Sequence, residues 1–186
     1  MNISTNDMRP GQTLDLDGTL FNIVNYQHVK PGKGQAFVKT KLKNVRTGAV
    51  VDRTFRADEK VNLAVLDKRE MQFLYADAAG LVFMDNENFE QTHVDPGLLG
   101  ESRTWLKEGM TAVIPVYEGT PVGAELPVSV ALEITDTEPG MKGDRVSGAL
   151  KPATVETGGV VQVPLFFEKG DRIKIDTRSG EYVSRA

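Results

Sequence analysis

The residues best suited to chemistry stand in one short glycine-rich segment, Lys30-Pro31-Gly32-Lys33-Gly34. Gly32 and Gly34 permit backbone angles closed to other residues, and Pro31 keeps Lys30 extended. The segment therefore predicts a tight hairpin tip that holds Lys33 in solvent. A long cation on a thin tip can reach into a narrow anionic cavity and is accessible to a modifying enzyme. The alternative is an ordinary basic hairpin turn. A phosphate-binding P-loop is excluded, because the required spacing and the following helix are absent.

Catalysis and metal binding find little support in the sequence. The chain has two histidines, His28 and His93, and no cysteine, so a structural zinc site with four nitrogen or sulfur ligands is not expected. His28 adjoins the tip and could orient Lys33, although a hydrogen-bonded histidine at a strand end is commoner. No paired acid and base or Ser-His-Asp order is visible. A catalytic lysine usually needs burial, whereas Lys33 should be exposed. We predict a protein that is not an enzyme, with no catalytic residues, no metal and no cofactor.

A basic strand follows the tip. Residues 36–43 alternate between apolar and polar side chains, which puts Lys39, Lys41 and Lys43 on one face. Together with Arg53 and Arg56 they could form a surface that faces phosphates. The solvated face of a strand pair is the alternative.

Two polar segments near the C-terminus could contact RNA. Gly143, Asp144 and Arg145 begin a glycine-rich loop that is either a recognition loop or a plain surface loop. Residues 176–182 form a turn between two expected strands, where charge or stacking could engage RNA. The candidates there are Arg178, Tyr182 and Arg185. A polar hairpin end is the alternative for this turn.

These residues must be positioned by strands, because long helical patterns are absent. In the first part of the chain, Asp17-Gly18 is a strong hairpin signal between two apolar runs. Five short strands within about 60 residues predict a small SH3-like barrel. The alternation identifies four of these strands, at residues 13–16, 20–26, 36–43 and 49–55.

The remainder of the chain has the same character. A short helix is expected within residues 95–107, with Trp105 and Leu106 covering a core. The expected strands cover residues 71–75, 80–84, 89–92, 110–117, 126–135, 160–167, 172–176 and 181–184.

A faint internal repeat links the middle and last sections at an offset of 61 residues. Leu106, Gly109, Ile114, Gly119 and Val122 match Phe167, Gly170, Ile175, Gly180 and Val183. A shared fold of about 60 residues favours a five-stranded OB-like barrel. We therefore predict an all-β chain of three small β-barrels in series, with domains at 1–64, 65–127 and 128–186.

Charge is distributed unevenly along the chain. Residues 1–64 hold 10 Lys+Arg and 6 Asp+Glu, a net of +4, whereas residues 65–186 hold 12 and 20, a net of -8. A basic end on an acidic body can be oriented on a phosphate-rich surface. No run of about 18 apolar residues and no secretory signal pattern is present, so we expect a cytoplasmic protein without a membrane partner.

Several segments together resemble one family, bacterial elongation factor P. They extend over essentially the whole chain in the family's order, and the most specific is the C-terminal run. The matching segments are residues 26–37, 53–55, 82–85, 151–158 and 174–183.

This resemblance implies a KOW/SH3-like N-terminal domain with the lysine tip and two OB domains, in an L shape like a transfer RNA. It further implies a monomeric factor that binds the 70S ribosome between the P and E sites. The expected contacts are peptidyl-tRNA in the P site, rRNA and the E-site codon of the mRNA. The family stimulates peptide-bond formation at consecutive prolines, where the ribosome performs the chemistry.

The resemblance also implies roles for single residues. Lys33 occupies the tip position, which a lysine-modifying enzyme extends in many members and leaves unmodified in others. Gly143, Asp144 and Arg145 match the loop that approaches the E-site codon, although members usually carry a smaller residue at the position of Arg145. Tyr182 and Arg185 match positions near the small subunit. A paralogue with another ribosomal task and a generic KOW/OB RNA-binding module are the competing hypotheses.

Overall fold

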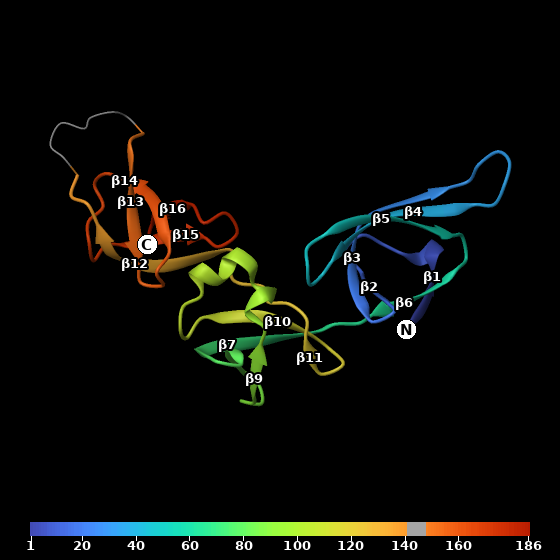
Figure 1. Cartoon of the computed structure of the whole chain (residues 1–186), viewed down its shortest axis with the longest axis horizontal. Helices are drawn as coiled ribbons and strands as arrows, with labels where there is room; N and C mark the ends of the chain where they lie inside the picture. Colours follow the sequence, from blue (N-terminus) through green and yellow to red (C-terminus); the bar gives the residue numbers. More distant parts are fainter. Residues whose placement is uncertain (141–147) are drawn as a thin grey trace. The chain divides into compact units, whose positions relative to one another are not determined.

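The computed structural model describes residues 1–140 and 148–186 and contains three β-sheets with a few short 3-10 helices (Figure 1). The chain divides into two compact units. The N-terminal unit comprises Met1–Arg69 with Ile114–Gly123, and the C-terminal unit comprises Glu70–Val113 with Ala124–Ala186. The predicted all-β class is confirmed. The predicted domain boundaries stay predictions.

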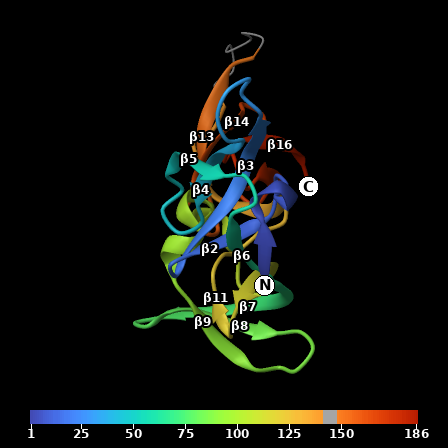
Figure 2. The ribbon, with the colours of Figure 1, turned by 90° about the vertical axis from the view of Figure 1, so that its right-hand side faces the viewer.

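The first sheet has six strands in the order β1-β6-β2-β3-β4-β5. Figure 2 shows the strands β2 to β6 of this sheet from a second direction. The 3-10 helix η1 (Thr5–Asp7) follows β1 and is capped by the Ser4 hydroxyl. The strands are β1 (Asn2–Ser4), β2 (Thr13–Leu16), β3 (Thr19–Val29), β4 (Phe37–Asn44), β5 (Val50–Arg56) and β6 (Lys60–Ala64).

Local sequence explains why the first hairpin forms. Leu16 pairs with Thr19 across the two-residue turn Asp17-Gly18, and both turn residues have positive φ, 54° and 87°. This is the backbone that a tight hairpin requires and that Asp-Gly tolerates. The sheet packs around one core. Its buried members are Met8, Leu14, Ile23, Val38, Leu42, Phe55 and Val61.

The second sheet has the order β11-β10-β7-β8-β9. Its strands are β7 (Asp67–Asp77), β8 (Gly80–Asp85), β9 (Gln91–Val94), β10 (Thr111–Tyr117) and β11 (Thr120–Pro121). The helix expected within residues 95–107 consists instead of two 3-10 helices, η2 (Pro96–Leu98) and η3 (Gly100–Trp105). Asp95 caps the first of them through the N–H of Gly97, and Pro96 favours its first turn.

The third sheet has the order β14-β13-β12-β15-β16. Its strands are β12 (Ser129–Thr137), β13 (Leu150–Val155), β14 (Val160–Pro164), β15 (Arg172–Asp176) and β16 (Tyr182–Arg185). The core under this sheet contains Leu132, Ile134, Ala153, Val155, Val161, Val163, Phe167, Ile173 and Ile175, together with Trp105 from η3.

The repeat detected in the sequence has a structural counterpart. Gly109 and Gly170 both have positive φ. The N–H of Gly109 donates to the carbonyl of Phe73, and the N–H of Gly170 donates to the carbonyl of Ile134. The two acceptors, like the two glycines, are 61 positions apart. Ile114 and Ile175 are both fully buried. The strands β7 and β12 carry a bulge after the same two positions, Phe73 and Ile134. The second and third sheets are therefore built on one plan.

Four strands of the described residues were not predicted from the sequence, namely β1, β6, β11 and β13. The first three are short, with three, five and two residues. β13 contains Pro152, which argues against a central strand. Proline is tolerated there because pairing with β12 extends only to Ala153.

Among the residues that the structure describes, no helix has the length and apolar character needed to span a membrane.

Candidate functional site

The lysine tip lies at the end of the longest hairpin of the first sheet. β3 has 11 residues and β4 has 8, and the connecting loop of the hairpin reaches beyond the other strands of its sheet (Figure 1). The residues of the loop from Lys30 to Gln35 are all exposed. Lys33 has no hydrogen-bond or ion-pair partner among the described residues. The ammonium group is thus available to another molecule.

Gly34 gives the tip its shape. Its φ is +104°, a conformation that side chains disfavour. A methyl group at Gly34 would lie 3.9 Å from Cγ of Pro31, an ordinary contact, so the backbone angle and not lack of space requires glycine there. The predicted hairpin tip with an exposed lysine is what the structure has, whereas the functional role of Lys33 stays a prediction.

His28 forms no hydrogen bond with the tip lysine, and a role in orienting Lys33 stays a prediction. It pairs with Val38 in the strand register, which puts it on the core side of β3 at intermediate exposure. Its ring forms no hydrogen bond with any residue of the described ranges. His93, by contrast, contacts Asp77 through Nε2 at 2.9 Å. That hydrogen bond is the main reason why the pKa of Asp77 lies below its ordinary value.

The three strand lysines share one exposed face of β4. Lys39, Lys41 and Lys43 are exposed, while Val38, Thr40 and Leu42 between them are buried. The Thr40 hydroxyl donates to the carbonyl of Arg53 at 2.7 Å, which ties β4 to β5 beneath the lysines. None of the three lysines forms an ion pair within the described ranges. They form a row of positive charge without ion pairs, and Asp52 of β5 lies opposite Lys41 in the register.

The two arginines that were grouped with these lysines lie on different faces. Arg56 pairs with Phe37 and shares the lysine face. Arg53 pairs with Thr40, on the core side, and its guanidinium stacks 4.9 Å from the ring centre of Phe55. The predicted single surface therefore includes Arg56, while Arg53 points to the other side of the sheet.

A shallow depression of about 370 Å³ lies where β3, β4 and β5 are side by side, lined by residues of both alternating sets of these strands. Its rows are set by register: Gln27, Lys39 and Thr54 form one row, and Asn25, Lys41 and Asp52 form the next. The residues that line it are Asn25, Gln27, Lys39, Thr40, Lys41, Asp52, Arg53 and Thr54. Such a surface offers cations and amide hydrogen bonds to a polyanion.

The neighbours of the lysines on β3 and β5 were missed from sequence. Asn25 and Gln27 join Lys41 and Lys39 because a bulge at Val24 shifts the pairing of β3 by one residue. Alternation within each strand was visible, but the bulge depends on pairing between strands and left no local signal.

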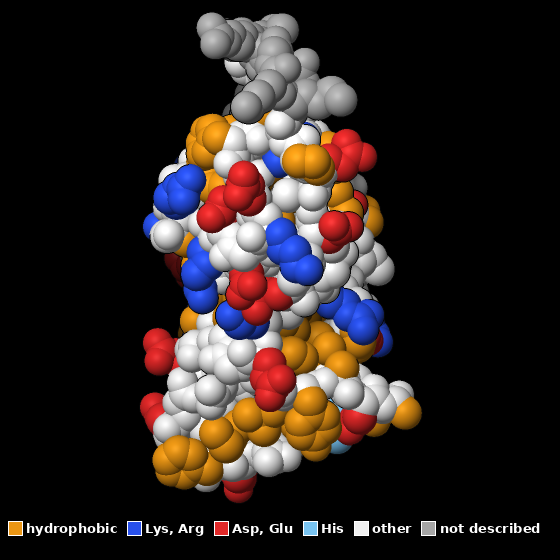
Figure 3. Space-filling view, turned by 90° about the vertical axis from the view of Figure 1, so that its left-hand side faces the viewer, with side chains coloured by type: hydrophobic (Ala, Val, Ile, Leu, Met, Phe, Trp, Pro, Cys, Tyr) orange, Lys and Arg blue, Asp and Glu red, His pale blue; other side chains and the backbone are white. Residues whose placement is uncertain are grey.

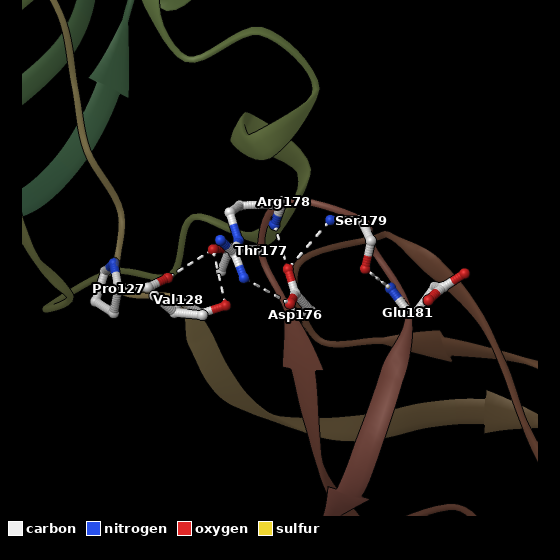
Figure 4. A network of polar contacts seen from close by, with 7 residues as sticks. All are labelled: Pro127, Val128, Asp176, Thr177, Arg178, Ser179 and Glu181. Carbon is white, nitrogen blue, oxygen red and sulfur yellow. Dashed lines mark hydrogen bonds and ion pairs between the residues drawn. The ribbon is translucent and has the colours of Figure 1, made fainter. Parts of the chain in front are cut away.

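The three C-terminal candidates lie in two environments (Figure 4 shows the turn). Arg178 is exposed in the turn between β15 and β16, with Nη2 3.5 Å from Oδ2 of Asp176. The ring of Tyr182 packs edge-on against Phe167 at 5.3 Å. Arg185 stacks 4.9 Å from the same Phe167 ring and lies 3.9 Å from Asp171. Arg178 is open to a partner, whereas Tyr182 and Arg185 already pack against the barrel.

The carboxylate of Asp176 organises this turn. Oδ1 accepts the N–H groups of Arg178 and Ser179 at 2.8 and 3.2 Å. These two backbone hydrogen bonds hold the pKa of Asp176 below its usual range. The loop residues Gly143, Asp144 and Arg145 lie outside the described residues, so their predicted role stays a prediction.

Charged side chains elsewhere in the described part of the chain do not gather into a cluster that could hold a metal ion. Basic and acidic side chains are interspersed on the face drawn in Figure 3. Within residues 1–140 and 148–186, no group of three or more His, Asp or Glu side chains is placed to hold a metal ion.

Comparison with known proteins identifies three family models along the chain. Residues 4–61 match the elongation factor P KOW-like domain, residues 66–124 the elongation factor P OB domain, and residues 130–185 the elongation factor P C-terminal domain.

Close relatives cover nearly the whole chain. The chain is 55% identical over 183 residues to elongation factor P of Acidothermus cellulolyticus, covering 98% of both proteins. It is 54% identical over 184 residues to elongation factor P of Moorella thermoacetica, covering 99% of this chain and 100% of the relative.

A solved structure supports the fold. The chain is similar to eukaryotic translation initiation factor 5A from Methanococcus jannaschii, with a TM-score of 0.55 and 20% identity, covering 68% of this chain and 94% of that one. At this identity the likeness concerns the fold alone. The three matched domains and the two full-length relatives go further: the chain belongs to the elongation factor P family of translation elongation factors.

Proposed function

We propose that this factor binds the 70S ribosome between the P and E sites, positions peptidyl-tRNA and stimulates peptide-bond formation at consecutive prolines. The observation that carries the proposal is Lys33, exposed and unpaired within the described residues at the tip of the longest hairpin of its sheet. A thin tip with a terminal cation suits a narrow cavity lined by RNA.

The factor contributes positioning, and the ribosome contributes the reaction. Holding the end of peptidyl-tRNA in the reactive geometry reduces the entropy that the reaction otherwise has to overcome. This role requires an exposed Lys33 rather than a buried base, and it requires no cofactor. A covalent extension of Lys33 by a modifying enzyme would lengthen the same reach.

The lysine row supplies the attraction to nucleic acid. Lys39, Lys41 and Lys43 have no ion-pair partner in the described part of the chain, so phosphates of tRNA or rRNA can pair with them without breaking existing contacts. Residues 65–186 carry a net charge of -8, which disfavours binding to free RNA of any sequence. Recognition then depends on the combined surface of ribosome and tRNA.

At the other end of the chain, Arg178 is the candidate with the most freedom to contact rRNA, since its side chain is 75% exposed. Tyr182 and Arg185 would present only the edges that their packing leaves open. Gly143, Asp144 and Arg145 are proposed to approach the E-site codon of the mRNA, and the factor is proposed to act as a monomer.

The test is translation of a reporter with consecutive prolines in a reconstituted system. Wild-type protein should relieve the stall, Lys33→Ala should not, and the matched control Lys60→Ala, an exposed lysine on β6 of the same sheet, should behave as wild type. If protein from its native host also fails to relieve the stall, and instead binds free RNA tightly, a generic RNA-binding module replaces the proposal.

A further inference from the structure

The 3-10 helix η3 carries the one tryptophan of the chain out of its own sheet. η3 lies between β9 and β10, which belong to the second sheet. Trp105 nevertheless packs within the core of the third sheet, among residues such as Ile134, Val163 and Phe167, and is only 7% exposed. Both sheets lie largely in the C-terminal unit, and this ring links them.

Gly159 leaves room for the ring. A Cβ atom at Gly159 would lie 2.6 Å from Cζ3 and 2.9 Å from Cη2 of Trp105, and 2.8 Å from Cγ2 of Thr104. These distances are shorter than any real carbon contact, and the backbone of Gly159 does not have positive φ. The side chains of Trp105 and Thr104, not the turn geometry, therefore exclude a side chain at this position.

A second glycine also approaches the indole of Trp105. At Gly180, in the turn between β15 and β16, a Cβ atom would lie 3.0 Å from Cζ2 of Trp105. Two turns of the third sheet, 156–159 and 177–180, thus close on one indole. The burial of such a large ring is among the strongest apolar contacts a protein forms.

Polar contacts flank the indole. Nζ of Lys107 lies 3.1 Å from Oε1 of Glu156, and that oxygen also accepts the N–H of Glu133 at 3.0 Å. Burial alone would raise the pKa of Glu156, but these two partners outweigh it and keep the pKa below its usual value.

The chain that leads into β12 is held by the same turn as Gly180. The buried hydroxyl of Thr177 donates to the carbonyl of Pro127 at 2.6 Å, and the N–H of Thr177 donates to the carbonyl of Val128 at 2.9 Å (Figure 4 shows the hydroxyl contacts). The turn 177–180 therefore contacts both the segment that leads into β12, through Thr177, and Trp105, through Gly180.

We propose that Trp105, seated on Gly159 and Gly180, is a joint that holds the second and third sheets of the C-terminal unit as one rigid body. The segment 176–182 is interpreted from sequence as an RNA-contacting turn. In this proposal its main role is to pack against Trp105 through Gly180. The proposal stands independently of the function proposed above.

The experiment measures the distance between the two sheets. Because the chain has no cysteine, Gln91→Cys on β9 and Gln162→Cys on β14, both exposed, can carry a pair of spin labels. The labelled protein should give one narrow distance distribution. Gly159→Ala should broaden it and shift the emission of Trp105 to longer wavelength, because the ring is forced out of its seat.

Two variants separate the joint from general damage. Gly158→Ala is the matched control: its φ is +89° and its Cβ would touch nothing within 4 Å, so it strains the same turn without reaching Trp105. It should leave the distribution narrow. Trp105→Phe together with Thr104→Ser in the Gly159→Ala background should narrow the distribution again, because the shorter ring and the loss of the Thr104 methyl group make room for the added methyl group.

If Gly159→Ala does not fold, Trp105→Ala removes the ring without any clash and should broaden the distribution in the same way. A distribution that is already broad in the labelled parent protein, or one that stays narrow when the ring is displaced or removed, overturns the proposal.

Discussion

At the scale of single residues, Gly32 and Gly34 contribute differently to the backbone conformation of the tip. Both have space for a side chain, but only Gly34 has positive φ. Gly34→Ala should therefore destabilise the N-terminal unit by about 1–3 kcal/mol through backbone strain. Gly32→Ala should stay within about 0.5 kcal/mol of wild type, as an exposed substitution does. Denaturant unfolding of both variants measures the difference, and equal stabilities would contradict the assignment of strain to Gly34.

The exposed pair of Asp77 and His93 gives a second prediction at this scale. The pKa of Asp77 lies below the reference 3.8 because His93 and two backbone N–H groups, of Ala79 and Gly80, bind its charged form. A depressed folded-state pKa adds stability above the unfolded value, and this stability is lost as pH falls through the folded pKa. Titration of the Asp77 carboxyl by NMR should show the low pKa. His93→Ala should raise it only in part, since the backbone donors remain, and an unchanged value would refute the role of His93.

At the scale of elements, the proposed phosphate contacts lie on the surface formed by β3, β4 and β5. If Lys39, Lys41 and Lys43 each neutralise one phosphate, each alanine substitution should reduce the slope of log binding constant against log salt by about 1. Ribosome binding measured across a salt series gives this slope. Lys60→Ala, separated from β4 by β2 and β3 in the sheet order, should leave it unchanged. If the alanine substitutions at Lys39, Lys41 and Lys43 leave the slope unchanged, this face of the sheet does not contact RNA.

At the scale of the whole molecule, the lysine tip and the tryptophan joint should affect function differently. In the proposed function Lys33 contacts peptidyl-tRNA in the reactive complex, so its loss should lower the maximal rate of stall relief. Loosening the joint with Gly159→Ala leaves the tip intact but adds a motion that binding must suppress. It should raise the half-saturating factor concentration several-fold and spare the maximal rate. A titration of each variant in the proline reporter assay distinguishes the two, and a lowered maximal rate for Gly159→Ala would contradict this separation.

Much of the architecture could be predicted because its signals are local. The Asp17-Gly18 turn, the glycines around Lys33 and the alternation through Lys39, Lys41 and Lys43 each require only neighbouring residues to be interpreted. The 61-residue repeat carried the shared plan of the second and third sheets, down to the glycines at 109 and 170. Short strands such as β1 and β11 lack enough residues for a pattern, and Pro152 concealed β13.

An all-β chain with an exposed lysine tip and a basic strand face can be predicted from local sequence, because turn chemistry and period-two alternation act within a few residues. Which residues share a surface can be seen only in the folded chain. The bulge at Val24 places Asn25 beside Lys41, and the strand register places Arg53 on the opposite face. Trp105 packs in the core of the third sheet rather than of its own. Each of these depends on contacts between distant segments, whose register and packing leave no trace in any one stretch of sequence.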